Sequence, residues 1–157
     1  MNNDHVVQMT QQGYDELVAE LADIENVKLP AAITRVAAAR AHGDLSENSE
    51  YHAAREDLSM LEGRLDEVKS IIQRAQVIVT HGKVTVVGIG TQVTVQVAGK
   101  KGTQVFHIVG EWEADPLEKK ISEKSPLGQA LAGKKVGDEV QIEVPAGQLT
   151  YVVQKVA

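Results

Sequence analysis

The feature that most constrains this chain is a long run of apolar residues spaced alternately by three and four positions. This spacing places every member on one face of an α-helix and turns that face toward a partner helix. The members of the run are Tyr51, Ala54, Leu58, Leu61, Leu65, Val68, Ile72 and Ala75. The sequence therefore predicts a coiled-coil helix over this segment.

A shorter seam of the same kind precedes it. Its members are Tyr14, Leu17, Leu21 and Ile24, followed after a slip of one residue by Leu29, Ile33 and Val36. Pro30 stands at the slip and lacks the amide hydrogen that a helix uses, so we expect a kink or a local change of phase there. Thr10 has the side chain of an N-cap and is expected to begin this helix.

The segment between the two seams, Gly43 to Asn48, is rich in turn and cap residues. A short link between two heptad helices makes them antiparallel neighbours. We therefore predict a helical hairpin over residues 1–76, with an acidic tip near residues 43–49. Some 30 residues per helix, at about 1.5 Å each, give a rod of roughly 45 Å.

After Gln76 the apolar period changes to two. Alternation at 93–97 and 105–109, and again at 140–144 and 149–156, predicts two β-hairpins. Between them, Ser125 as cap and Pro126 at the first helical position predict a short helix that ends near Leu131. The fold class is α+β with two domains, the second over residues 83–157 with an antiparallel sheet and one short helix, and residues 77–82 form the boundary.

Charge and composition exclude several functions. Residues 1–76 carry 14 acidic and 7 basic side chains, and this acidic half should be repelled by free nucleic acid. Only five aromatic residues are present, too few for a base-stacking platform. The chain has no cysteine, no apolar stretch near the roughly 20 residues that span a bilayer, and no visible secretory signal. We expect a soluble, cytoplasmic protein without a membrane partner.

Two carboxylates, Asp44 and Glu47, lie three residues apart at the expected tip. Their spacing fits a capping box that begins the second helix, and Ser46 is an alternative cap. It also fits a pair of hard oxygen ligands, because Mg²⁺ is typically held by one or two protein carboxylates. His42 and His52 flank the tip without a zinc-ligand spacing. The spacing alone leaves capping and metal binding open.

A resemblance narrows the choice. The run from Ala39 to Glu56, ARAHGDLSENSEYHAARE, resembles the signature of the bacterial Gre-type transcript cleavage factors. The likeness extends from Met9 to Val156 through several shorter motifs: Met9-Thr10-x-x-Gly13, Ile108-Val109-Gly110 with Glu113-Ala114-Asp115, Ile121-Ser122, Ser125-Pro126-Leu127-Gly128 and Gly133-Lys134-Lys135-x-Gly137-Asp138. The sequence departs from the family pattern at Leu29, where arginine is frequent, and at Ser49, where alanine is common.

The resemblance implies a fold and a mechanism. The fold is an N-terminal antiparallel coiled coil followed by an FKBP-like domain that docks on RNA polymerase. The coiled coil enters the secondary channel of a backtracked polymerase, where Asp44 and Glu47 help to hold a second Mg²⁺ and an attacking water. Arg40 and Arg55 would contact the displaced nascent RNA 3′ end. The factor would be a monomer, inert alone, without its own bound metal.

Three alternatives remain at this stage. Some Gre-like proteins keep tip carboxylates and inhibit the polymerase instead of stimulating cleavage. An FKBP-like domain could catalyse prolyl isomerisation, although Phe106, Trp112 and Tyr151 are few aromatic residues for such a pocket. A coiled-coil adaptor with capping acids at its tip is the third. For Arg40 and Arg55, ion pairing with Glu50 or Glu56 is the alternative to RNA contact.

Overall fold

The computed structural model describes residues 5–44 and 47–157 and groups them into two units. One unit is Asp15–Arg74. The other consists of the described part of Met1–Tyr14 together with Ala75–Ala157. The division into 1–76, 77–82 and 83–157 stays a prediction.

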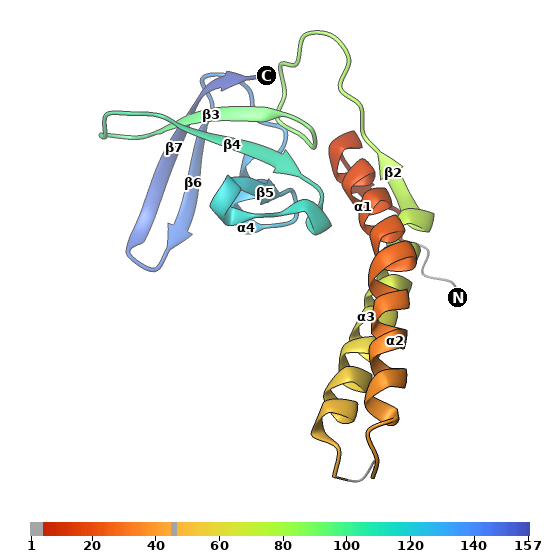
Figure 1. Cartoon of the computed structure of the whole chain (residues 1–157). Helices are drawn as coiled ribbons and strands as arrows, with labels where there is room; N and C mark the ends of the chain where they lie inside the picture. Colours follow the sequence, from red (N-terminus) through yellow and green to blue (C-terminus); the bar gives the residue numbers. More distant parts are fainter. Residues whose placement is uncertain (1–4, 45–46) are drawn as a thin grey trace. The chain divides into compact units, whose positions relative to one another are not determined.

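The hairpin is formed by four consecutive helical segments. They are α1 (Gln11–Asp23), the π-helical turn η1 (Ile24–Lys28), α2 (Leu29–Arg40) and α3 (Ser49–Arg74). Helices α2 and α3 run side by side along the hairpin (Figure 1). The predicted antiparallel coiled coil is confirmed, and so is the cap, because the Thr10 hydroxyl accepts a hydrogen bond from the Gly13 amide at 3.0 Å.

The slip in the first seam corresponds to the π-turn. The amide of Leu29 donates to the carbonyl of Ile24, five residues back, so η1 holds one residue more than an α-helical turn. Asp23 and Lys28, also five apart, form an ion pair of 3.2 Å across the turn. Because of this extra residue, the apolar positions that follow the π-turn again face the other helix. The expected change of phase beside Pro30 is confirmed.

Burial along the hairpin corrects two details of the predicted seams. Ile33 is 53% exposed, because the turn shifts the inward positions to Ala32, Val36 and Ala39. In α3, Ile71 is fully buried and Ile72 only half-buried, as expected when a straight helix drifts from a strict heptad. Ala75, predicted to be the last seam position, lies in a strand instead.

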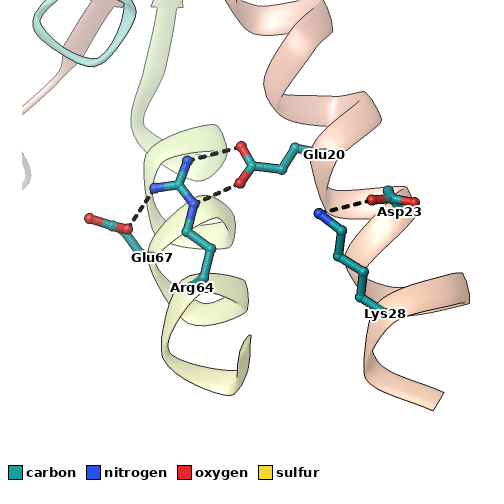
Figure 2. Close-up of polar contacts among 5 residues, drawn as sticks. All are labelled: Glu20, Asp23, Lys28, Arg64 and Glu67. Carbon is teal, nitrogen blue, oxygen red and sulfur yellow. Dashed lines mark hydrogen bonds and ion pairs between the residues drawn. The ribbon is translucent and has the colours of Figure 1, made fainter. Parts of the chain in front are cut away.

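Ion pairs join the two sides of the hairpin. The Arg64 guanidinium donates to both carboxylate oxygens of Glu20, at 2.7 and 2.9 Å, and to Glu67 at 2.7 Å (Figure 2). The hydrogen bond from Arg64 lowers the pKa of Glu20, and the two glutamates raise that of Arg64. Further pairs across the hairpin are Lys69–Glu25 and Arg35–Asp57. Exposed pairs contribute about 0–1 kcal/mol each, so their main effect is to favour one register of the two helices.

The C-terminal sheet has five strands in the order β5-β4-β3-β7-β6. Their bounds are β3 (Gln92–Val97), β4 (Gln104–Val109), β5 (Lys120–Ser122), β6 (Glu139–Val144) and β7 (Gly147–Val156). Both predicted β-hairpins are confirmed, and β3 also pairs with β7 in antiparallel orientation. The expectation of a wholly antiparallel sheet was wrong, because β5 pairs with β4 in parallel. The chain between these strands, which includes η2 (Glu111–Glu113) and η3 (Pro116–Glu118), returns β5 in the direction of β4.

Helix α4 (Pro126–Leu131) covers part of this sheet. Its predicted cap is confirmed, since the Ser125 hydroxyl accepts from the Gly128 amide at 3.1 Å. Leu131 is fully buried with the inward residues of the strands, among them Val93, Val95 and Ile108. The mixed sheet and its short helix fit an FKBP-like domain.

A second, two-stranded sheet was not anticipated. Strand β1 (Val7–Met9) pairs in parallel with β2 (Ala75–Val77), which follows α3 directly. Met9 is fully buried. A Cβ atom on Gly110 would lie 2.3 Å from the carbonyl oxygen of Gln8, so only glycine allows β1 to lie this close.

Candidate functional site

The candidate site lies in the connection between α2 and α3. Helix α2 ends at Arg40 and α3 begins at Ser49. Asp44 and Glu47 lie in this connection, and both residues are exposed to solvent. Gly43 has a φ of +121°, a conformation that L-residues rarely adopt, and it turns the chain immediately before Asp44. The hairpin thus presents both carboxylates at its turn.

The cap of α3 is Asn48. Its side-chain oxygen accepts from the Tyr51 amide at 3.0 Å, and its carbonyl accepts from the His52 amide at 3.2 Å. The interpretation of Asp44 and Glu47 as a capping box was therefore wrong, because the helix begins later than that spacing assumed. Ser46, the alternative cap, lies outside the described residues. Sequence reasoning missed Asn48, although asparagine is among the best N-caps.

The two arginines beside the tip converge on one tyrosine. The Arg40 guanidinium carbon lies 5.8 Å from the centre of the Tyr51 ring. A hydrogen bond from Arg40 lowers the pKa of Tyr51, and the positive charges of Arg40 and Arg55 act in the same direction. Within the described ranges, no ion pair joins either arginine to Glu50 or Glu56. The sequence analysis assigned Tyr51 only to the apolar seam, so its contact with the two arginines was not predicted.

The donor set at the tip is incomplete as a metal site. Among residues 5–44 and 47–157, no three His, Asp or Glu side chains are grouped so that they could hold a metal ion. Mg²⁺ nevertheless often binds to only one or two protein carboxylates, while water and other molecules supply its remaining oxygen ligands. The two exposed carboxylates at the tip match this number. The residues present fit a Mg²⁺ ion whose other ligands come from a partner.

The aromatic residues of the C-terminal unit do not line a pocket together. Phe106 and Tyr151 are buried and pack edge to face, with ring centres 6.3 Å apart, as part of the core. Trp112 is 47% exposed and does not belong to this core. This arrangement gives prolyl isomerisation no support. No described helix is long and apolar enough to span a membrane.

Comparison with known families covers both parts of the chain. The family model described as "Transcription elongation factor, N-terminal" matches residues 7–77, and "Transcription elongation factor, GreA/GreB, C-term" matches residues 81–157. The chain belongs to the GreA/GreB family of transcription elongation factors. The resemblance inferred from the tip motif is thereby confirmed.

Two relatives named GreA agree with this assignment. Transcription elongation factor GreA of Lactococcus lactis subsp. cremoris (strain SK11) is 43% identical over 150 residues, covering 94% of this chain and 96% of the relative. GreA of Bacillus subtilis (strain 168) is 38% identical over the full length of both chains. The crystal structure of GreA factor homolog 1 of Thermus thermophilus has 27% identity and a TM-score of 0.45, covering 98% of this chain and 99% of its own. This GreA/GreB family member is a transcription elongation factor, and the factors of its family act on RNA polymerase rather than as enzymes of their own.

Proposed function

We propose that this factor rescues backtracked RNA polymerase by stimulating endonucleolytic cleavage of the nascent RNA. The hairpin enters the secondary channel, and its tip reaches the polymerase active site. The observation that carries the proposal is the exposure of Asp44 and Glu47 in the turn of the hairpin, ahead of Asn48, whose side chain caps α3. About 30 residues of continuous helix before the turn give a reach of roughly 45 Å.

In this proposal Asp44 and Glu47 would supply carboxylate oxygens to a second Mg²⁺ at the polymerase active site. Such an ion offsets the negative charge that develops on the attacking and leaving oxygens. Water adds to phosphorus and loses a proton, while the bond from phosphorus to the RNA 3′-oxygen breaks and that oxygen gains a proton. The shortened transcript then ends in a hydroxyl group from which synthesis can resume.

Arg40 and Arg55 bind the displaced RNA. A guanidinium pairs well with phosphate oxygens, and both arginines lie close enough to Tyr51 to lower its pKa, so their positive charges lie near each other. The acidic character of the rest of residues 1–76 disfavours binding to other nucleic acids. The C-terminal unit docks on the polymerase, and the factor acts as a monomer in the cytoplasm.

A stalled, backtracked elongation complex with a labelled transcript tests the proposal. Purified factor and Mg²⁺ should shorten the transcript, and Asp44→Asn or Glu47→Gln should slow this shortening by about 10-fold or more. Glu62→Gln removes one exposed carboxylate elsewhere on α3 and should cleave normally. Slower elongation without shortening would favour the inhibitory alternative, and normal cleavage by Asp44→Asn and Glu47→Gln would refute the role of the acids.

A further inference from the structure

Asn48 connects the two helices at the base of the tip. Its side-chain nitrogen donates a hydrogen bond of 2.8 Å to the carbonyl oxygen of Ala39, in the last turn of α2. The oxygen of the same amide group caps α3 through the Tyr51 amide. One side chain thus bonds to the backbone of both helices.

The residues around this connection are buried. Ala39 is 1% exposed and Tyr51 is 6% exposed, and both belong to a small apolar cluster at this end of the hairpin. The last carbonyls of a helix lack partners within the helix, and Asn48 supplies one to Ala39 from across the turn. The same carbonyl also accepts from the His42 amide at 3.2 Å, which uses both of its lone pairs.

Only asparagine combines these two roles in a side chain of this length. Serine and aspartate can accept the capping hydrogen bond, but aspartate has no proton to donate and serine has no amide group to reach across the turn. Both Asp44 and Glu47 lie between the bonded residues Ala39 and Asn48. Closing a chain segment at its two ends reduces the number of conformations that it can adopt.

We propose that Asn48 is a positioning residue that holds the turn so that Asp44 and Glu47 face one metal ion together. Glu47 directly precedes the fixed residue, and Asp44 directly follows Gly43, whose conformation sets the direction of the chain. A misplacement of about 1 Å at such a site can cost roughly 100-fold in rate. This inference rests on the proposed function.

Asn48→Ser and Asn48→Ala separate positioning from capping. Serine keeps an acceptor for the Tyr51 amide and loses the bond to Ala39, whereas alanine loses both. Asn26→Ser, at an exposed position of the hairpin, makes the same chemical change elsewhere and is the control. Amide hydrogen exchange provides a readout that needs no polymerase. Exchange at His42 should accelerate in Asn48→Ser, while the Tyr51 amide loses its protection only in Asn48→Ala.

In the cleavage assay, Asn48→Ser should cleave about 10-fold more slowly at saturating factor and need more Mg²⁺ for half-maximal cleavage. Its thermal stability and its half-saturating concentration on the polymerase should stay near those of the unmodified factor, which a merely structural role would not predict. Normal cleavage and Mg²⁺ dependence in Asn48→Ser, with Asp44→Asn and Glu47→Gln defective, would overturn this inference alone. Normal cleavage in all three variants, or none by the unmodified factor, would overturn the proposed function and this inference with it.

Discussion

The carboxylate of Glu113 binds Thr10, a residue 103 positions earlier that begins the first helix. One oxygen accepts from the Thr10 amide at 3.0 Å and from the Gly110 amide at 2.8 Å, and the other accepts from the Thr10 hydroxyl. Three donors thus converge on one carboxylate. The two family motifs that contain Thr10 and Glu113 are therefore parts of one contact, which holds the first turn of α1 on the unit that contains the sheet.

This contact predicts energetic coupling between Thr10 and Glu113. Thr10→Ala removes the cap and one donor to Glu113, and Glu113→Ala removes the acceptor of both Thr10 groups. The double variant should be less destabilised than the sum of the single variants, with a coupling of about 1 kcal/mol in chemical unfolding. Glu111→Ala is the control, because Glu111 pairs with the exposed Lys124 and should not couple to Thr10. Additive effects of Thr10→Ala and Glu113→Ala would contradict the prediction.

Two glycines in helices should respond to alanine in opposite directions. A Cβ atom on Gly13 would lie 2.1 Å from a Glu113 carboxylate oxygen, so Gly13→Ala displaces a side chain held by three donors and should lower the melting temperature. A Cβ atom on Gly63, in α3, meets nothing within 4 Å. Gly63→Ala should therefore stabilise the protein by about 0.5–1 kcal/mol, the usual gain in a helix. Thermal unfolding of both variants checks the pair, and a rise with Gly13→Ala would show that the contact is not tight.

The bond between Glu20 and Arg64 predicts an acid-dependent part of the stability. The pKa of Glu20 is lowered in the folded state from its ordinary value of 4.5, chiefly by the hydrogen bond from Arg64. The unfolded chain therefore binds the proton first as the pH falls. The stabilisation is present above 4.5 and is lost as the pH falls through the lower, folded-state pKa. Both side chains are partly exposed, so the effect should be small.

Glu20→Gln should accordingly lower the melting temperature at neutral pH and converge with the unmodified protein at low pH. Glu62→Gln, which removes an exposed carboxylate of α3, controls for the change in net charge. A constant difference between Glu20→Gln and the unmodified protein at every pH would show that the loss does not come from this titration.

Tyr51 should ionise at a lower pH than an ordinary tyrosine. The hydrogen bond from Arg40 is the main cause of its lowered pKa. The ultraviolet titration of the unmodified protein, minus that of Tyr51→Phe, isolates the titration of this ring. Arg40→Gln should raise the pKa of Tyr51 again. Arg35 lies earlier in α2, farther from the tip, and pairs with Asp57, so Arg35→Gln should leave the pKa of Tyr51 unchanged. An equal response to both variants would argue against a direct bond to Arg40.

The tip arginines should affect RNA binding rather than metal binding. Arg40→Gln and Arg55→Gln should each reduce crosslinking of the factor to the displaced RNA 3′ end by several-fold, because each loses a charge-assisted contact to phosphate. The Mg²⁺ concentration for half-maximal cleavage should stay unchanged. Unchanged crosslinking in both variants would remove the RNA-contacting role, and a shifted Mg²⁺ dependence would reassign the arginines to the metal site.

Signals within one helix or one β-hairpin determined much of this protein in advance. Several features depend only on neighbours within a few positions: the apolar seams, the helix caps Thr10 and Ser125, and the change of phase before Pro30. For that reason the sequence alone predicted the coiled coil, both β-hairpins and α4. The family resemblance named Asp44, Glu47, Arg40 and Arg55 as site residues. Their positions at or beside the turn are seen in the structure, while their roles stay a proposal.

Only the tertiary structure decided which distant segments meet. The pairing of β1 with β2, the parallel pairing of β5 with β4, and the bond of Glu113 to Thr10 join residues whose local sequences do not indicate a partner. At the tip, several residues could cap α3, and the choice of Asn48 depends on the nearby carbonyl of Ala39 on the other helix. Such contacts form between groups that are far apart in the sequence and share no periodic pattern. The sequence analysis therefore did not predict them.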